Sequence, residues 1–244
     1  MTALLDTLHT GAQAVLWIGV SVAAYAAALR LYRWRNASPF LIPVATGAAL
    51  LVAILLASGV RYQSYREAIR PLEAMLGPAT VALAVPLYRQ LERLRRIWLP
   101  LTFALAIGCI GAVVSAVGIA WAFGGTPELL VSLAPKSATM PLAIPVAERL
   151  GGQPSLAAVA VAFTGVVGAV ATRPLMHRVQ IEDDRVRGFV SGLTAHAIGV
   201  ARELQVSPVG AGFAALAMCL NGMATALFVP IAHGVMTHWL GWLA

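Results

Sequence analysis

One lysine lies inside a long apolar part of the sequence. Lys136 is the only lysine among the 244 residues, and the stretch 133–145 around it contains no other charged residue. An ammonium group in apolar surroundings attracts an anion, and the hydroxyls of Ser137 and Thr139 can donate hydrogen bonds to the same ligand. These residue types therefore indicate a site for a small carboxylate. The alternative is a lysine whose stem reaches the membrane surface beside a proline-rich loop.

The prolines near Lys136 predict that this stretch is not one straight helix. They are Pro127, Pro135, Pro141 and Pro145. Each lacks a backbone N–H group and crowds the preceding helical turn. We expect a break near Lys136, followed by a helix that has Pro141 in its first turn and Ser137 or Thr139 as its N-cap. The positive end of that helix would lie beside the ammonium group.

A second group of ionisable residues lies in the amphipathic stretch 188–205. His196 titrates near neutral pH, so it is a candidate for a proton that moves with the substrate, and Glu203, on the same face of a straight helix, is the other candidate. Arg202 offers a further contact for a carboxylate, although it can approach His196 only if Gly199 breaks or bends the helix. For His196 the alternative is a structural hydrogen bond between helices.

Two further polar residues complete the set of candidates. Thr80 lies in the proline-interrupted segment 75–88, whose pattern Ala-Thr-x-x-Leu-Ala-x-Pro recurs after Lys136. Paired broken helices often form the substrate site of transporters. Asn221 lies in the last apolar stretch and is either a ligand or a hydrogen-bonding link between helices. The predicted substrate contacts are Lys136, Ser137, Thr139, Thr80, His196, Arg202 and Asn221, and the proton-coupling candidates are His196 and Glu203.

Composition places these residues in a membrane protein. The chain is 59% hydrophobic and 11% charged, with a mean hydropathy of +0.81, which leaves too few polar residues to cover a water-soluble domain. The net charge of +7 does not indicate nucleic-acid binding, because the arginines separate apolar stretches and act as topology signals. Cys109 and Cys219 lack the spacing of metal ligands or of a disulfide framework. No metal, cofactor or catalytic residue is expected.

The apolar stretches predict an all-α polytopic membrane protein with about six to eight hydrophobic segments, including broken or re-entrant helices as in transporters. One integral membrane domain over residues 1–244 accounts for the length. The clearest segments are 14–32, 40–60, 97–123, 155–176 and 210–236, and a short surface helix is expected at 62–73. Segment 128–149 either spans the membrane or re-enters, and the arginine distribution favours re-entry. The same distribution places the N-terminus outside the cell.

Three motifs in the sequence resemble the LrgB/CidB family. They are Leu133-Ala-Pro-Lys-Ser-Ala-Thr-Met-Pro-Leu-Ala-Ile, Gly151-Gly-Gln-Pro-Ser-Leu-Ala-Ala-Val and Ala195-His-Ala-Ile-Gly-Val-Ala-Arg202. The segment 76–88 is similar as well, so the resemblance covers nearly the whole chain. Met140, Ala195 and Val200 depart from the family pattern, in which hydroxyl residues are usual at these places.

The resemblance implies a bacterial inner-membrane protein that works with a small LrgA/CidA-type membrane partner. The family is linked to the control of murein hydrolase activity and autolysis. It also implies kinship with the plastid glycolate/glycerate translocator and with bacterial pyruvate uptake systems.

Two functions are consistent with these observations. The first is a secondary carrier of small monocarboxylates such as glycolate, glycerate, lactate or pyruvate. The second is a holin-like or antiholin-like regulator that oligomerises and controls murein hydrolases indirectly. Lys136 and the broken segments favour the carrier, because an oligomerising span needs neither. An enzyme is not expected, because the signatures His-Glu-x-x-His and Gly-x-Ser-x-Gly are missing. The expected partners are the carboxylate, the LrgA/CidA-type protein, the lipid bilayer and further copies of the chain.

Overall fold

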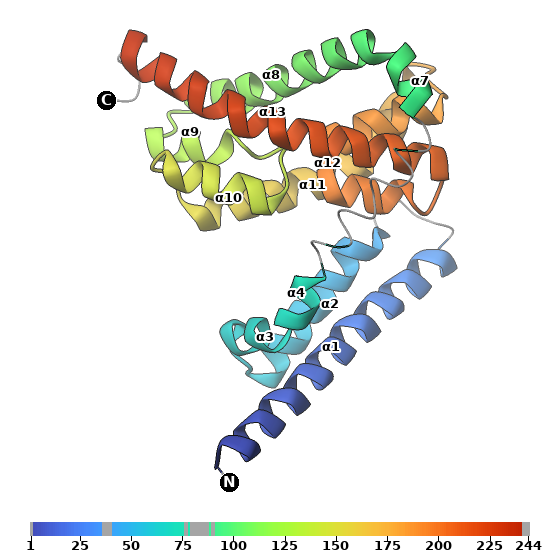
Figure 1. Ribbon diagram of the computed structural model, residues 1–244, viewed down its shortest axis with the longest axis vertical. Helices are drawn as coiled ribbons and strands as arrows, with labels where there is room; N and C mark the ends of the chain where they lie inside the picture. The colour runs from blue at the N-terminus through green and yellow to red at the C-terminus, as the bar shows by residue number, and fades with distance from the viewer. Residues whose placement is uncertain (1, 36–40, 76–77, 79–87, 89–90, 241–244) are drawn as a thin grey trace. The chain divides into compact units, whose positions relative to one another are not determined.

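The computed structural model describes residues 2–35, 41–75, 78, 88 and 91–240, and these residues contain helices and no strand. The chain divides into two compact units, Met1–Leu83 and Ala84–Ala244, which Figure 1 draws in blue and in green to red. In the described residues, four helices are long and apolar enough to cross a membrane, or up to five if a bent pair of helices forms one span. The all-α polytopic class is confirmed, with somewhat fewer spans than the six to eight segments expected.

The described part of the first unit contains α1 (Thr2–Trp34), α2 (Pro43–Ser58), α3 (Tyr62–Ala68) and α4 (Arg70–Ala74). The chain turns by 118° between α2 and α3. Tyr65 on α3 then packs edge-on against Trp17 of α1, with ring centroids 5.6 Å apart, and its hydroxyl lies 3.0 Å from that of Ser21. The short helix expected at 62–73 is therefore present as α3 and α4, and it is fastened to α1.

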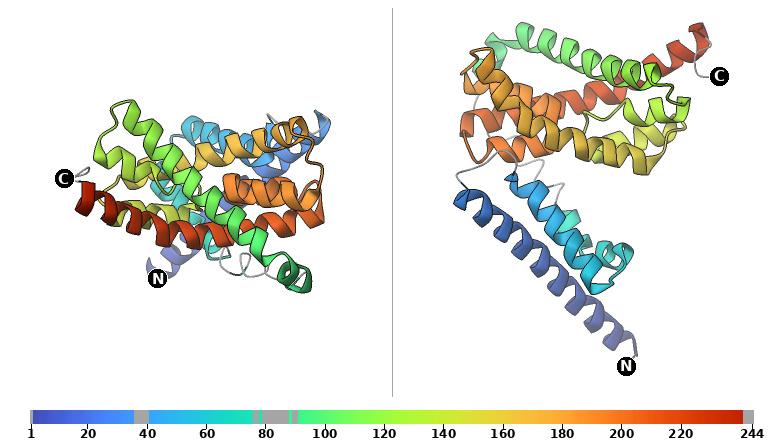
Figure 2. Two further views of the ribbon diagram at one scale, coloured as in Figure 1. Left: turned by 90° about the horizontal axis from the view of Figure 1, so that it is seen from above. Right: turned by 180° about the vertical axis from the view of Figure 1, so that it is seen from behind.

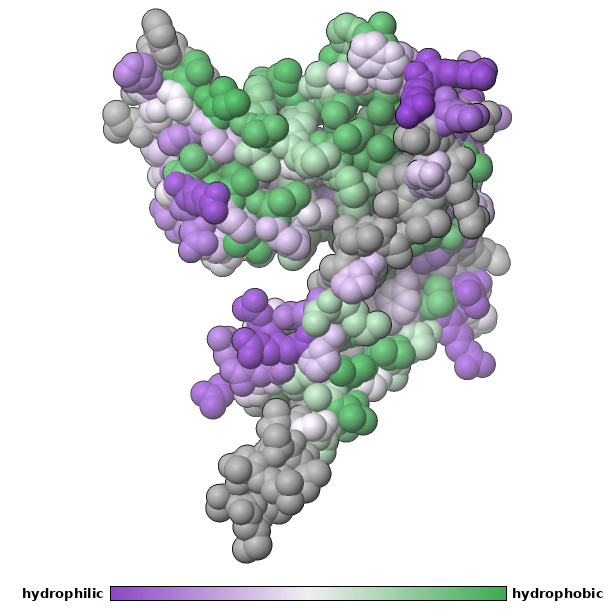
Figure 3. Space-filling view, viewed as in Figure 1, coloured by the Kyte–Doolittle hydropathy of each residue, from purple (hydrophilic) through white to green (hydrophobic). Residues whose placement is uncertain are grey.

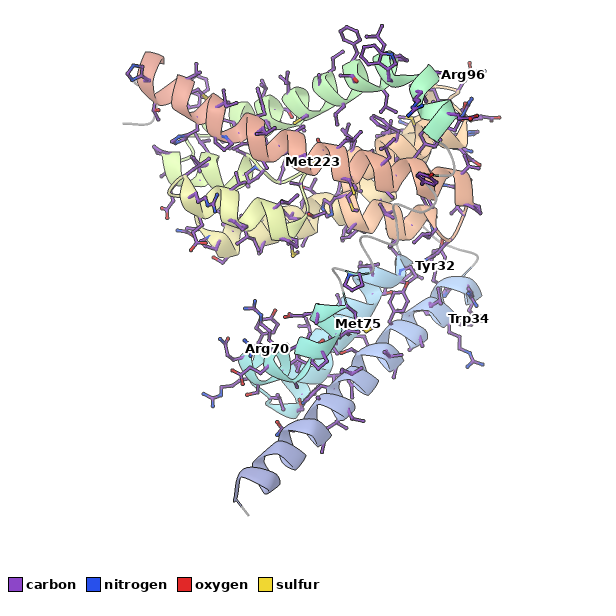
Figure 4. The ribbon with its side chains drawn as sticks, viewed as in Figure 1. Tyr32, Trp34, Arg70, Met75, Arg96 and Met223 are labelled. Atoms are coloured by element: carbon purple, nitrogen blue, oxygen red, sulfur yellow. The ribbon has the colours of Figure 1, made fainter. Side chains whose placement is uncertain are left out.

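The described part of the second unit contains α7 (Leu91–Arg96), α8 (Trp98–Ala122), α9 (Pro127–Leu133), α10 (Met140–Arg149), α11 (Pro154–Arg178), α12 (Asp184–Glu203) and α13 (Pro208–Leu240). The long helices α8, α11 and α13 agree with the apolar stretches expected there. Hydrophobic residues cover the visible surface of α8 and α13, whereas hydrophilic residues gather near α7 (Figure 3), where Arg96 is labelled in Figure 4.

Helices α8 and α13 run in the same general direction and cross at an angle (Figure 2). Leu101, in the first half of α8, belongs to a cluster with Phe213 in the first half of α13. Val113 and Val229, in the second halves of the same helices, pack in another cluster. Each half of this helix pair is therefore covered by a different element, as Figures 1 and 2 show.

The second halves of α8 and α13 are covered by α9 and α10, which form the first hairpin (residues 127–149). Ala134, near its turn, packs against Val113 and Val229. Beyond α10, a Cβ on Gly152 would lie 2.9 Å from Ser132 Oγ near the end of α9 and 3.1 Å from the Ala147 carbonyl oxygen on α10. The chain thus returns alongside α9 after the break between the two helices, and the re-entry of 128–149 stays a prediction.

The first halves of α8 and α13 are covered by α12, which is a second hairpin (residues 184–203). The chain reverses at His196, whose φ of 41° and ψ of −128° are not helical. A straight helix would separate Asp184 from Glu203 by about 28 Å. Both instead lie against Gly210, where a Cβ would be 3.2 Å from the Asp184 carbonyl oxygen and 2.9 Å from Glu203 Oε2. The first arm (184–195) and the second arm (197–203) are therefore antiparallel neighbours.

Candidate substrate site at the tips of the two hairpins

Asn221 on α13 connects the tips of both hairpins. The tip of the first hairpin is the turn at residues 134–139, and the tip of the second is the bend at His196. Its Nδ2 donates to the carbonyl oxygens of Ser137 at 3.0 Å and of Leu193 at 3.2 Å. Only the NH₂ group can donate both bonds, so the amide orientation is fixed and Oδ1 remains an acceptor. Oδ1 is buried and has no hydrogen-bond partner among the described residues. Asn221 thus faces the interior, whereas Met223, labelled in Figure 4, is 56% exposed.

The two hairpins approach Asn221 from opposite ends of the second unit. α8 is followed by the first hairpin, and α11, which runs in the reverse direction, is followed by the second. α11 begins beside the second half of α9, where the Gln153 N–H donates to Ser132 Oγ at 2.8 Å. Further along, Gly168 of α11 lies against Ala195, next to the bend in α12. Helix–hairpin pairs of opposite direction that meet near the middle form the substrate sites of many carriers.

Lys136 lies at the tip of the first hairpin, where the sequence predicts the break. Its N–H donates to the Leu133 carbonyl oxygen at 3.1 Å, which closes the turn after α9. Thr139 is the N-cap of α10, as expected, but its side chain makes no capping hydrogen bond. Among the described residues no carboxylate lies within ion-pair distance of the half-buried Lys136. The tip therefore combines an ammonium group, hydroxyl groups and the positive end of α10.

His196 connects the tip of the second hairpin to α11. Its Nε2 lies 3.0 Å from the Val161 carbonyl oxygen. A carbonyl only accepts, so Nε2 carries the hydrogen and the neutral ring keeps Nδ1 as an acceptor. Val161 also packs against Ala138 and Ala143 of the first hairpin. His196 is 3% exposed and thus reaches the region where both tips converge.

A straight helix would place Gly192 and Gly199 on either side of His196, but in the structure neither glycine flanks the imidazole ring. A Cβ on Gly192 would lie 2.0 Å from the Ala214 carbonyl oxygen, and one on Gly199 would lie 2.3 Å from the Ser191 carbonyl oxygen. These glycines therefore hold α12 against α13 and the two arms against each other. The glycine beside the imidazole ring is Gly165 of α11, where a Cβ would lie 2.6 Å from His196 Cε1.

Arg202 and Glu203 do not lie at the tips. The bend occurs at His196 and not at Gly199, so the second arm carries Arg202 about 9 Å away from it. The expectation that Glu203 shares a helical face with His196 is wrong for the same reason. Thr80, the remaining candidate, lies outside the described residues.

The structure brings Arg202 and Glu203 to the open end of the second hairpin, together with Arg173 and Arg187, which in the sequence indicate only topology. Glu203 is fully buried and interacts electrostatically with Arg173 and Arg187. Hydrogen bonds from Ser207 and Arg187 hold the pKa of the Asp184 carboxyl below its ordinary range. The sequence signal for this group is the pair of charge clusters at 182–187 and 202–203, which only a hairpin can bring together.

Comparison with known proteins decides the family. The sequence profile of the LrgB-like family matches residues 21–235. The chain belongs to the LrgB-like family. The matched region includes both hairpins, so the candidate site lies in the part that defines the LrgB-like proteins. No solved structure matches the chain.

Two bacterial relatives illustrate the similarity. The uncharacterized protein YxaC of Bacillus subtilis (strain 168) is 34% identical over 218 residues, which cover 89% of this chain and 94% of YxaC. The antiholin-like protein LrgB of Bacillus mycoides (strain KBAB4) is 27% identical over 214 residues, 88% of this chain and 93% of that protein. The resemblance to the LrgB/CidB family is confirmed, and the apolar helices make this LrgB-like chain a multi-pass membrane protein.

Proposed function

We propose that the chain is a secondary carrier of small monocarboxylates of the glycolate, glycerate, lactate or pyruvate class. The observation that carries this proposal is the meeting of two opposed hairpins at Asn221, with Lys136 in one of the tips. Lys136 and the N-terminal end of α10 would hold the carboxylate, and Ser137 and Thr139 would donate hydrogen bonds. A structural span that only oligomerises needs no unpaired ammonium group in its interior.

The proposal also covers the location of the carrier in the cell and its protein partners. We place it in the bacterial cytoplasmic membrane as one domain over residues 1–244, with its N-terminus outside and the arginine-rich ends of α7 and α11 inside. An LrgA/CidA-type membrane protein and further copies of the chain are the proposed partners. His196 and Glu203 are the two candidates for proton coupling, and their separation in the fold makes them independently testable.

A second candidate function is supported by the relatives. The Bacillus proteins named antiholin-like protein LrgB support an antiholin-like regulator of murein hydrolase activity and autolysis. Such a regulator would change the permeability of the membrane or the assembly of a holin-like partner. It would not select one solute over another.

One experiment separates the two functions. The purified chain is reconstituted into vesicles that contain a trapped dye, and uptake of labelled glycolate, glycerate, lactate and pyruvate is measured beside dye release. The carrier predicts saturable uptake of some of these acids without dye release. Dye release without saturable uptake, or control of murein hydrolase activity in cells without any uptake, would favour the regulator.

A further inference from the structure

The open end of the second hairpin holds a buried carboxylate that the proposed tip site does not use. Glu203 has 0% exposure, and neither of its carboxylate oxygens has a hydrogen-bond partner among the described residues. Its Oε2 lies so close to Gly210 that a Cβ there would be 2.9 Å away. A buried and unbonded carboxylate is costly unless nearby charges stabilise it.

The charges that act on Glu203 come from α11 and from both arms of the second hairpin. Arg173 on α11, Arg187 on the first arm and the adjacent Arg202 attract its carboxylate, and Asp184 repels it. We call these five residues the base cluster. Its three guanidinium groups exceed its two carboxylates by one charge, so ionised Glu203 leaves the cluster with one net positive charge.

Two donors of the base cluster are also unsatisfied. Arg173 Nε and Arg187 Nε are buried and have no hydrogen-bond partner among the described residues. The Asp184 carboxylate accepts from Ser207 and from Arg187 Nη2, the latter at 2.5 Å, and it interacts with Arg173 only through its charge. Guanidinium groups with free donors are well suited to a planar carboxylate, which they bind through paired hydrogen bonds.

We propose that the base cluster is a second site for small carboxylates and that Glu203 is its built-in competitor. While ionised, the Glu203 side chain supplies the negative charge that the arginines require. When it takes up one proton, the cluster gains a second unit of positive charge and a substrate carboxylate replaces it. No other bond forms or breaks, so one proton and one carboxylate enter together.

The inference rests on the proposed carrier function for the identity of the anion, but binding to the base cluster is measured separately. The probe is sodium acetate, compared with sodium chloride at equal ionic strength. The readout is the unfolding temperature of the purified full-length chain in detergent, at a mildly acidic pH above the pKa of acetate and at a mildly alkaline pH. A ligand that binds only the folded state raises this temperature.

In the parent chain, acetate should raise the unfolding temperature by about 2 °C or more at the acidic pH and have little effect at the alkaline pH. Glu203→Gln removes the competing charge, so the acetate effect should be present at both pH values. Arg173→Gln should abolish it at both. Arg178→Gln is the matched control, because Arg178 is an exposed arginine on the same helix, outside the base cluster, and it should respond as the parent does.

Three outcomes would overturn the inference: an acetate effect in Arg173→Gln equal to that of the parent, an unchanged pH dependence in Glu203→Gln, or loss of the effect in Lys136→Met, which would place acetate at the tip. If Glu203→Gln does not fold, a parent effect that is independent of pH overturns the role of Glu203.

Failure of vesicle uptake with this binding pattern intact rejects the carrier function but leaves the base cluster as a carboxylate site. Uptake without the pattern rejects the site and leaves the carrier.

Discussion

At the residue scale, substitution of Lys136 gives the most specific test of the proposed carboxylate site. If its ammonium group holds the substrate carboxylate, Lys136→Met removes a charge-assisted hydrogen bond worth about 1.5–3 kcal/mol. Uptake in vesicles should then fall by a factor of about 10 to 150, since each 1.4 kcal/mol corresponds to about tenfold. The variant should still insert and unfold at the parent temperature, because no described carboxylate pairs with Lys136.

The matched control for Lys136 is Arg149→Gln. Arg149 is an exposed basic residue in the last turn of α10, at the other end of the same helix. It should leave uptake unchanged if position and not total charge matters. Normal uptake by a stable Lys136→Met protein would reject the carboxylate site at the tip.

Substitutions of His196 distinguish a structural role, through its hydrogen bond to Val161, from a role as the proton carrier. Glutamine can donate to the Val161 carbonyl oxygen as Nε2 does, but it does not titrate near neutral pH. If Glu203 carries the proton, His196→Gln should keep both uptake and its dependence on a pH gradient. His196→Ala leaves the Val161 carbonyl without its donor and should cost about 1–3 kcal/mol of folding free energy, measured by chemical unfolding. Loss of the gradient dependence in His196→Gln would move the coupling to the hairpin tip.

At the scale of elements, the second hairpin depends on glycine contacts. A Cβ on Gly192 would lie 2.0 Å from the Ala214 carbonyl oxygen, and one on Gly188 would lie 2.1 Å from the Gly210 carbonyl oxygen. The first arm of α12 can approach α13 this closely only without side chains at these two positions. The close packing partly offsets the unfavourable backbone at His196, whose positive φ costs about 1–3 kcal/mol.

Gly192→Ala should therefore force α12 and α13 apart. We expect a loss of about 1–3 kcal/mol, the usual cost of overpacking, seen as a lower unfolding temperature. The control is Gly118→Ala on α8, because a Cβ there meets nothing within 4 Å. If both variants unfolded at the same temperature, the close packing of the second hairpin on α13 would be disproved.

At the scale of the whole molecule, the hairpins fix the order in which segments face the two sides of the membrane. The connection after α11 and the connection after α12 lie at one end of the second unit, and the start of α11 lies at the other. Gln153, Gln180 and Gln205 are exposed and mark these three places. A straight α12 would instead cross the membrane and reverse the side of Gln205.

Cysteine labelling distinguishes these topologies. In a background with Cys109 and Cys219 replaced by alanine, single cysteines at Gln180 and Gln205 should react from the same side, and one at Gln153 from the opposite side. The arginines near Gln180 predict that its side is cytoplasmic. Labelling of positions 180 and 205 from opposite sides would show that α12 spans the membrane.

Features that depend on local chemistry can be predicted from the residues alone. Composition and the long apolar stretches together specify a helical membrane protein, because 11% charged residues cannot cover a soluble surface and the stretches are long enough for membrane helices. The prolines near Lys136 specify the first break, since they remove backbone donors regardless of what surrounds them. An N-cap at Ser137 or Thr139 and the three long helices of the second unit follow from equally local signals, and the structure selects Thr139 as the cap.

The second bend, and the residues that it brings together, depend on contacts between distant segments. No proline marks His196, and its stretch has the pattern of a straight amphipathic helix, so the reversal depends on contacts of Gly188 and Gly192 with α13. Asn221 finds its acceptors 84 and 28 residues away along the chain. The same folding separates Glu203 from His196 and places it among arginines of other segments, because a buried charge is stabilised by its neighbours in space and not in sequence.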